Sequence, residues 1–318
     1  MVLLLFSLMP ITVVSANETI NLTEATDLLN PVDKIILEND GTTLTINGDV
    51  FKSASQSDSL GSLSAIESEA SNTTVTINSD SDATTDDEID LNQIQSVTGI
   101  SALTVNGDGG ANTIRLSSVL STSGIVAVNL GVDTEADKLI FNLDQNSYKS
   151  TGSDSLGYNV IEDFDVSEDM FGIFYNGAGF GQTTMQTLSS AATIAPTQSE
   201  ALIELDVSNL ISTNLEAIDT VSEVKSSIAN TISSVGQDID TISTVTYVRN
   251  NASGATDKFA VINGADFTAM NPRGTSDLGS SDTFAVASIA KVLGDNGGNI
   301  TRGQVSVDDN TLLSDPFA

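Results

Sequence analysis

The residues of this chain whose types could do chemistry are carboxylates that stand in short turns. Two such turns run directly into apolar residues, GDGGANTI at residues 107–114 and GVDTEADKL at residues 131–139. Glycines let a turn offer its backbone carbonyl oxygens, and an aspartate adds negative charge. Oxygen atoms of this kind are the ligands that calcium takes in proteins. The pattern therefore indicates turns that bind a divalent cation, each followed by a strand whose apolar residues point into a core.

Two further acidic stretches each allow two interpretations. SDSDATTDDEID, at residues 79–90, is either a solvated loop or a metal-binding loop, and runs of charge are usually solvated. Residues 163–169 carry the alternating oxygen ligands of an EF-hand loop. However, Glu168 stands where that loop needs glycine, and Phe174 stands where it needs a bidentate glutamate. The alternative is that residues 163–169 form a solvated turn between two buried strands.

The elements that must position these turns are short strands in a repeated unit. LTINGD, VTINSD and LTVNGD end at Asp49, Asp80 and Asp108. Their alternating apolar residues suit a strand with one buried face, and Asn-Gly-Asp favours a tight turn. The aspartates lie 31 and 28 residues apart, too far for one rung of a compact β-coil, so we expect a repeated hairpin or multi-strand unit. One hairpin is expected between residues 34–38 and 41–47, because Asp-Gly joins them.

Composition narrows the possible functions. The 318 residues include 43 acidic and 11 basic ones, for a net charge of −32. Binding to nucleic acid or to an anionic membrane surface depends on Lys and Arg, so we expect neither partner and expect cations instead. Cys and His are both absent. Their absence removes disulfides, thiolate zinc sites, cysteine nucleophiles and histidine bases, which favours a protein that is not an enzyme.

The sequence divides into three regions. Residues 1–16, MVLLLFSLMPITVVSA, are apolar and end in small residues, as a signal peptide does, and the alternative is a buried first strand. Residues 17–195 are expected to form a β-rich repeat region with acidic turns. Residues 196–318 are expected to form a C-terminal α+β domain. An amphipathic helical segment is predicted there at about 208–235, where apolar residues recur at helical spacing after a capping box at residues 213–216.

Part of the chain resembles the end of the repeat region in RTX (repeats-in-toxin) secreted proteins. The similar segments are residues 109–114, ADKLIF at 136–141 and NVIEDFDVSEDMFGIF at 159–174. In that family, Gly-Gly-x-Gly-x-Asp rungs bind calcium and are followed by a strand and a capping segment. The resemblance covers about residues 103–175, with a fainter echo at 243–307. It therefore implies a fold that is mainly β, with β-roll, β-solenoid-like or sandwich-like strands.

The resemblance also implies a cofactor, Ca²⁺, and a set of ligands. Asn112 stands where the family has Asp, and Glu135 replaces a Gly, so we expect one or two sites rather than a stack of them. The positions that match the rungs and the capping segment are Asp108, Asn112, Asp133, Asp137, Asp163 and Asp165.

These features favour a secreted, acidic, calcium-binding structural protein of the cell surface, such as a surface-layer, filament or adhesin subunit. Self-association would use exposed strand edges or the apolar amino terminus docked in a neighbouring copy. One alternative is an extracellular polysaccharide-binding or polysaccharide-active protein, since paired carboxylates can work without His. Against it, aromatic residues make up 5% of the chain and Trp is absent, which leaves few platforms for stacking sugars. A further alternative is the C-terminal export and folding module of a larger RTX-type protein.

Overall fold

The computed structural model describes the parts of the chain that build the sheets and the turns between them. The described residues are 11–22, 34–48, 63–79, 86–144, 146–150, 156–175, 186–188, 203–205, 220–224, 244–250, 259–266, 285–293, 300 and 304–307. Within them the protein is mainly β, as the sequence predicts, and its strands form several sheets. The expected helix at about 208–235 lies outside the described residues except for residues 220–224, of which 221–224 are helical.

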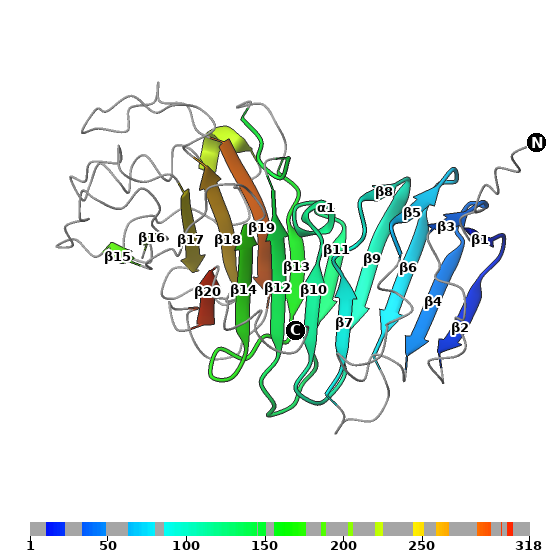
Figure 1. Ribbon diagram of the computed structural model, residues 1–318, viewed down its shortest axis with the longest axis horizontal. Coiled ribbons are helices and arrows are strands. Elements are labelled where there is room, and N and C mark those ends of the chain that lie inside the picture. Colours follow the sequence, from blue (N-terminus) through cyan, green and yellow to red (C-terminus); the bar gives the residue numbers. More distant parts are fainter. Residues whose placement is uncertain are drawn as a thin grey trace, which may run out of the picture.

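Three sheets carry most of the strands, and Figure 1 shows these strands side by side along the length of the molecule. Sheet A has the order β1 (Ile11–Val14), β3 (Lys34–Leu37), β5 (Ala65–Ser68) and β8 (Ser96–Thr98). Sheet B has the order β17 (Thr244–Asn250), β18 (Phe259–Asp266), β19 (Ala285–Leu293), β13 (Asn159–Glu162), β11 (Val126–Asn129), β9 (Ile100–Asn106), β6 (Thr73–Asn78), β4 (Thr43–Gly48) and β2 (Glu18–Leu22). Sheet C has the order β20 (Val305–Val307), β14 (Met170–Tyr175), β12 (Lys138–Leu143), β10 (Thr113–Leu116) and β7 (Glu88–Leu91). A separate pair joins β15 (Gln186–Leu188) to β16 (Ile203–Leu205).

The repeated sequence units stack on one another in parallel. Strands β4, β6 and β9 contain the three near-copies, and they pair in parallel with matching residues opposite one another. Asn78, for example, lies opposite both Asn47 and Asn106. The 31- and 28-residue spacings are therefore the length of chain from one strand of sheet B to the next. Among the described residues, the chain passes through β5 of sheet A between β4 and β6, and through β7 of sheet C and β8 of sheet A between β6 and β9. We call one such passage a circuit.

The hairpin expected between residues 34–38 and 41–47 is therefore wrong, whereas the alternative of a repeated multi-strand unit agrees with the circuits. Strand β3 belongs to sheet A and β4 to sheet B, so residues 34–38 and 41–47 do not pair with each other. The turn at Gly41, with a φ of +72°, carries the chain from one sheet to the next. A strand's alternating pattern predicts a buried face but does not say which strand lies beside it.

Buried aliphatic side chains fill the space inside the circuits. In β6 every second residue is buried, and Val75 and Ile77 are both 0% exposed. Leu44 and Leu103, which lie opposite Val75 on the neighbouring strands, are also 0% exposed. Each such side chain contributes about 1.5–3 kcal/mol to folding relative to an exposed position. Because the strands pair in register, the buried side chains of Leu44, Val75 and Leu103 form one continuous row in the core.

An asparagine ladder joins the same three circuits at the end of each strand. The Asn78 amide donates to Asn47 Oδ1 at 2.7 Å, and the Asn106 amide donates to Asn78 Oδ1 at 2.6 Å. We predict that Asn78→Ala lowers the free energy of unfolding by about 1–3 kcal/mol, because both neighbours lose a partner. Urea unfolding measures the change, and Thr76→Ala, on the same strand, is the control and should cost less. Equal losses for the two variants would show that the ladder adds nothing.

Sheet A ends where a short helix replaces its next strand. After β10 the chain forms α1 (Ser118–Ser121), which contacts β8, β10 and β12. Ser117 caps this helix, since its side chain accepts a hydrogen bond from the Leu120 N–H. Beside β8, the last strand of sheet A, the position of a next strand is therefore occupied by the helix α1.

Strands from both ends of the sequence join these sheets. Ile11–Val14 form β1, paired in parallel with β3, and Val14 is buried, in keeping with the alternative of a buried first strand; cleavage of residues 1–16 stays a prediction. Beyond residue 195, β19 pairs in parallel with β13, and β20 with β14. Sheets B and C thus continue across the boundary that the sequence predicts at 195/196. Within the described ranges, no helix has both the length and the apolar character of a membrane span.

Candidate functional site

Four of the six predicted ligands lie around one small cavity, which we call the acidic pocket. Asp133 and Asp137 belong to the turn before β12, and Asp163 and Asp165 to the turn before β14. The cavity has a volume of about 60 Å³. The other residues that line it are Gly131, Val132, Glu135 and Asp169.

The pairing of β12 with β14 brings these two turns together. Lys138 lies opposite Met170 at the start of the paired strands, so the residues just before them also meet. The Met170 N–H donates to the Asp137 carbonyl oxygen at 2.9 Å, and the Asp137 N–H donates to Asp169 Oδ1 at the same distance. The two acidic turns are thus held together by one backbone–backbone hydrogen bond and one from a backbone N–H to a carboxylate.

Hydrogen bonds within each turn fix the outer carboxylates. Asp133 Oδ1 accepts from the Glu135 N–H at 2.7 Å. Asp165 Oδ1 accepts from both the N–H and the hydroxyl of Ser167, each at 2.7 Å. These two bonds from Ser167 hold the pKa of Asp165 below its ordinary value. Asp165 is therefore charged at neutral pH, as a cation ligand needs to be.

A ladder of Asp and Asn side chains, which we call the Asx ladder, lies behind the acidic pocket. Its members are Asp87, Asn112, Asp137 and Asp169, each directly before a strand of sheet C and each no more than 3% exposed. The N–H of each of the first three donates to the side-chain oxygen of the next, at 3.0, 2.7 and 2.9 Å in chain order. Each circuit thereby caps the start of the previous circuit's strand.

Burial makes two members of this ladder unusual acids. The pKa of Asp137 is raised to about 8, mainly by burial and in smaller part by the charges of Asp169 and Asp133, while hydrogen bonds with Asn112 act in the opposite direction. Burial likewise raises the pKa of Asp169 to about 6, opposed by hydrogen bonds from Asp137 and Asp165. Negative charge at this position is thus costly to the folded state unless a cation or a proton offsets it.

Asp108 and Asn112 have other surroundings and do not line the acidic pocket. Asp108 has a φ of +57°, and its carbonyl packs closely against Gly131. The Asn112 amide nitrogen donates to the carbonyl oxygens of Gly107, Gly109 and Gly110 at 2.9–3.3 Å. A bound cation would use the backbone carbonyl oxygens of such a glycine-rich turn as ligands. Here the side-chain amide of Asn112 is hydrogen-bonded to these oxygens instead.

The sequence placed Asp169 only in the EF-hand-like stretch and not among the six predicted ligands, and it did not predict the Asx ladder. Asp169 is buried, so residues 163–169 are not simply a solvated turn. A signal was present, because each ladder residue stands two positions before a buried apolar residue: Ile89, Ile114, Leu139 and Phe171. Of the acidic stretch at 79–90, residues 80–85 lie outside the described residues, and Asp87 is the first member of the ladder.

The donor set of the acidic pocket suits a hard divalent cation. All its charged side chains offer oxygen, the ligand atom of calcium, and Asp133 Oδ2 is shielded from solvent without accepting a hydrogen bond. The present side-chain arrangement is not a formed coordination shell. Within the described ranges, no group of three or more acidic side chains is placed so that it could hold a metal ion. The chemistry of the pocket therefore fits calcium, and binding requires its outer carboxylates to converge.

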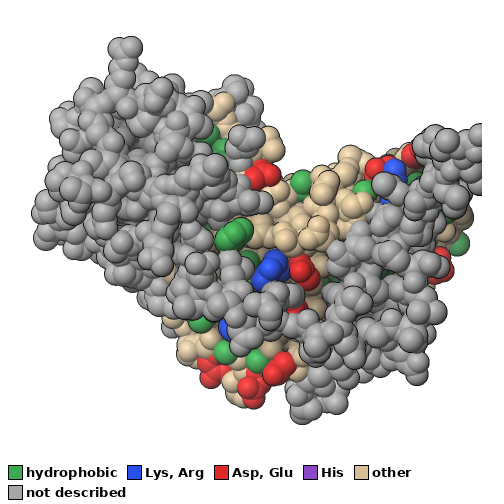
Figure 2. All heavy atoms as spheres, in the orientation of Figure 1, with side chains coloured by type: hydrophobic (Ala, Val, Ile, Leu, Met, Phe, Trp, Pro, Cys, Tyr) green, Lys and Arg blue, Asp and Glu red, His purple; other side chains and the backbone are tan. Residues whose placement is uncertain are grey.

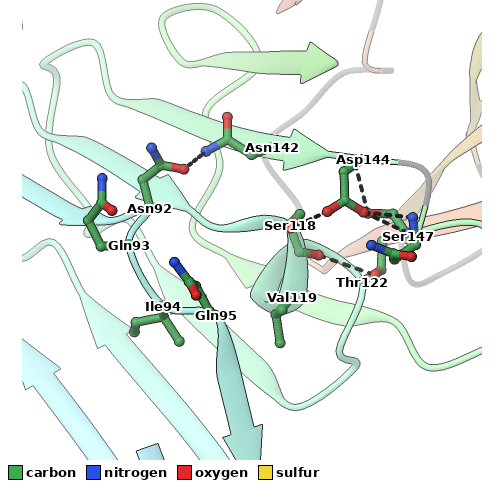
Figure 3. A pocket seen from close by; sticks show the side chains of 11 residues that line it. Asn92, Gln93, Ile94, Gln95, Ser118, Val119, Thr122, Asn142, Asp144 and Ser147 are labelled. Carbon is green, nitrogen blue, oxygen red and sulfur yellow. Dashed lines mark hydrogen bonds between the residues drawn. The ribbon is translucent and has the colours of Figure 1, made fainter. Parts of the chain in front are cut away.

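A larger cavity, of about 640 Å³, lies beside α1, and we call it the amide groove. Figure 3 shows that its side chains come from the corner after β7, from α1 and from the end of β12. The residues that line it are Asn92, Gln93, Ile94, Gln95, Ser118, Val119, Thr122, Asn142, Asp144, Asn146 and Ser147. In Figure 2 the surface over this middle part of the molecule is mostly tan, the colour of uncharged polar side chains and backbone. The groove thus differs sharply in charge from the acidic pocket.

The chain matches no protein-family model, no curated protein and no solved structure.

Proposed function

We propose that this chain is a secreted, acidic structural protein of the cell surface, a parallel β-solenoid of the RTX type that calcium stabilises at the acidic pocket. The observation that carries the proposal is the pair of buried carboxylates of Asp137 and Asp169, stacked behind two acidic turns. In a chain of net charge −32, ionisation of this pair opposes folding unless a cation is present. An extracellular medium supplies calcium at the concentrations that weak extracellular sites use.

A passive structural role agrees with the repetition of the circuits. Like residues stack on like residues across β4, β6 and β9, and an aliphatic core column and an asparagine ladder run along the stack. Such stacks are stabilised mainly by contacts between neighbouring units, which makes them stiff and elongated. They serve as spacers and scaffolds, the role expected of a filament, lattice or adhesin subunit.

Self-association is part of the proposal, and the open ends of sheets A and B support it. Strands β1 and β2 stand at the ends of their sheets, and no described strand pairs with the outer edge of either one. An unpaired strand edge offers a row of N–H and C=O groups to another chain. A second copy that adds its own strands there continues the same parallel pairing.

Calcium would be held by Asp133, Asp163 and Asp165, the outer carboxylates of the acidic pocket. The ion supplies positive charge next to carboxylates that the fold has placed together. Asp137 and Asp169 lie behind this position and orient the two turns through the Asx ladder. Their high pKa values mean that calcium competes with protons, so its affinity should rise with pH between about 6 and 8.

We expect calcium to raise the melting temperature of the protein and a chelator to lower it by several degrees. The test is a thermal unfolding curve by circular dichroism, at 1 mM calcium and in excess chelator. The double variant Asp133→Asn/Asp165→Asn should lose most of the calcium effect. Glu18→Gln/Glu69→Gln removes the same charge from exposed positions away from the pocket and should keep it. A melting curve that calcium leaves unchanged in the unmodified protein would refute the calcium proposal.

The same samples test self-association separately. Light scattering with calcium should show large particles whose amount rises with protein concentration. If calcium stabilises the protein but the protein stays monomeric at high concentration, the metal site is supported and the lattice or filament role is contradicted.

A further inference from the structure

The amide groove arises where sheet A stops. Strand β8 is the last strand of that sheet, and α1 takes the place of the next one. A helix of four residues does not continue the strand wall, so a hollow forms between the corner after β7, α1 and the loop after β12. Its volume of about 640 Å³ falls within the range of roughly 300–1,000 Å³ that is typical of ligand sites.

The lining of the groove is polar and almost uncharged. Five side-chain amides and three hydroxyls line it, with two aliphatic side chains and one carboxylate, Asp144. That carboxylate is already used within the fold. Its Oδ2 accepts from the Ser118 hydroxyl at 3.0 Å, and its Oδ1 accepts from the N–H groups of Asn146 and Ser147 at 2.7 and 3.1 Å. The lining contains no Lys or Arg, so nothing in it attracts an anion.

Two of the five amides that line the groove are paired with each other. Asn142 is 6% exposed, and its amide nitrogen donates to Asn92 Oδ1, as Figure 3 shows. The side chains of Gln93 and Gln95, by contrast, are exposed and belong to the corner after β7. The lining thus combines one paired couple of amides with exposed amides, and an amide can both donate and accept hydrogen bonds.

We propose that the amide groove binds a neutral carbohydrate chain. Sugar hydroxyls both donate and accept hydrogen bonds, so amides and hydroxyls complement them, and the aliphatic side chain of Val119 offers a surface for their C–H groups. Acidic glycans are repelled by a chain of net charge −32. The inference goes beyond the calcium-dependent role, because no residue that lines the groove lines the acidic pocket.

The test is titration calorimetry with neutral hexasaccharides of β-linked glucose, α-linked glucose and N-acetylglucosamine. We expect at least one of them to bind with a Kd below 1 mM. Gln93→Ala/Gln95→Ala should weaken that binding about tenfold or more, because two hydrogen-bonding amides are lost. Both side chains are exposed, so this variant should fold. Ser101→Ala, an exposed polar change outside the groove, should bind like the unmodified protein.

Three results would overturn the proposal. The first is that none of the hexasaccharides binds at 10 mM to protein whose folding circular dichroism has verified. The second is that a hexasaccharide binds equally well to the double glutamine variant and to an Asn146→Ala variant, which would place the site elsewhere. The third is tighter binding of hexagalacturonate or of an unstructured Gly/Ser hexapeptide than of any neutral sugar. Loss of calcium stabilisation in Asp133→Asn/Asp165→Asn, with sugar binding retained, would keep the two sites separate.

Discussion

Asp137→Asn is expected to raise the free energy of unfolding at pH 8.5 by a few kcal/mol in the absence of calcium. The pKa of Asp137 is about 8 in the folded protein, whereas its ordinary value is 3.8. Between these values the folded state holds a proton that the unfolded chain releases. The contribution of Asp137 to the free energy of unfolding therefore falls as pH rises from about 4 to 8, and it is constant below and above this range. An asparagine does not titrate, and its oxygen can still accept the hydrogen bond from the Asn112 N–H.

Position 112 shows that asparagine suits this place in the ladder. Asn112 is equivalent to Asp137 one circuit earlier, is 1% exposed, and accepts the Asp87 N–H through its side-chain oxygen. The measurement is urea unfolding in chelator at pH 4.5 and 8.5. The unmodified protein should lose stability over this interval, and Asp137→Asn should lose less.

Asp165→Asn is the control, because the pKa of Asp165 is shifted in the opposite direction to that of Asp137. The pKa of Asp165 is lowered by Ser167, so its contribution to stability is present above the ordinary pKa and lost as pH falls through the folded one. This variant should therefore have a lower free energy of unfolding than the unmodified protein at neutral pH. It should still lose stability between pH 4.5 and 8.5, as the unmodified protein does. If all three proteins gave parallel profiles from pH 4.5 to 8.5, the Asp137 carboxyl would not be the group that titrates.

Gly131→Ala should be the most destabilising small substitution near the acidic pocket, with a loss of roughly 3 kcal/mol or more. Gly131 has a φ of +99°, and a Cβ built there would lie 1.6 Å from the Asp108 carbonyl oxygen. Two backbones touch at this point, so no flexible side chain can move aside. Relief requires one of the two turns to shift.

Gly41→Ala is the control that measures the effect of a positive φ without a steric clash. Gly41 also has a positive φ, +72°, but a Cβ there meets nothing within 4 Å. Its substitution should cost only about 1–2 kcal/mol, the price of a left-handed conformation for alanine. Urea unfolding of both variants gives the difference. Similar losses at the two positions would mean that the turns at residues 108 and 131 move apart easily.

The strand units could be predicted from sequence, but their partners could not. LTINGD, VTINSD and LTVNGD each contain a strand, and their matching residues lie side by side. The spacing of about 30 residues was interpreted as a hairpin or multi-strand unit, because a single strand's pattern specifies a buried face and no neighbour. The near-identity of the copies was the usable signal, since an asparagine pairs well with an asparagine in a parallel, in-register stack.

The candidate site was also predictable in part. Carboxylates in turns before apolar residues identified Asp133, Asp137, Asp163 and Asp165, which the fold does bring together. The structural use of Asn112 was not foreseen, because its partners, Asp87 and Asp137, each lie 25 residues away along the chain. The amide groove gave no sequence signal at all. Its residues come from three separate segments and are individually ordinary surface types.

The Asx ladder has a direction, and this direction sets an order in which the stack can grow. In every rung the backbone N–H belongs to the earlier circuit and the accepting side chain to the later one. A newly synthesised chain therefore reaches the start of β7, β10 or β12 before the oxygen that completes it has been made. Each rung therefore closes only after the next circuit has been made, and until then the N–H before β7, β10 or β12 has no side-chain acceptor from this ladder.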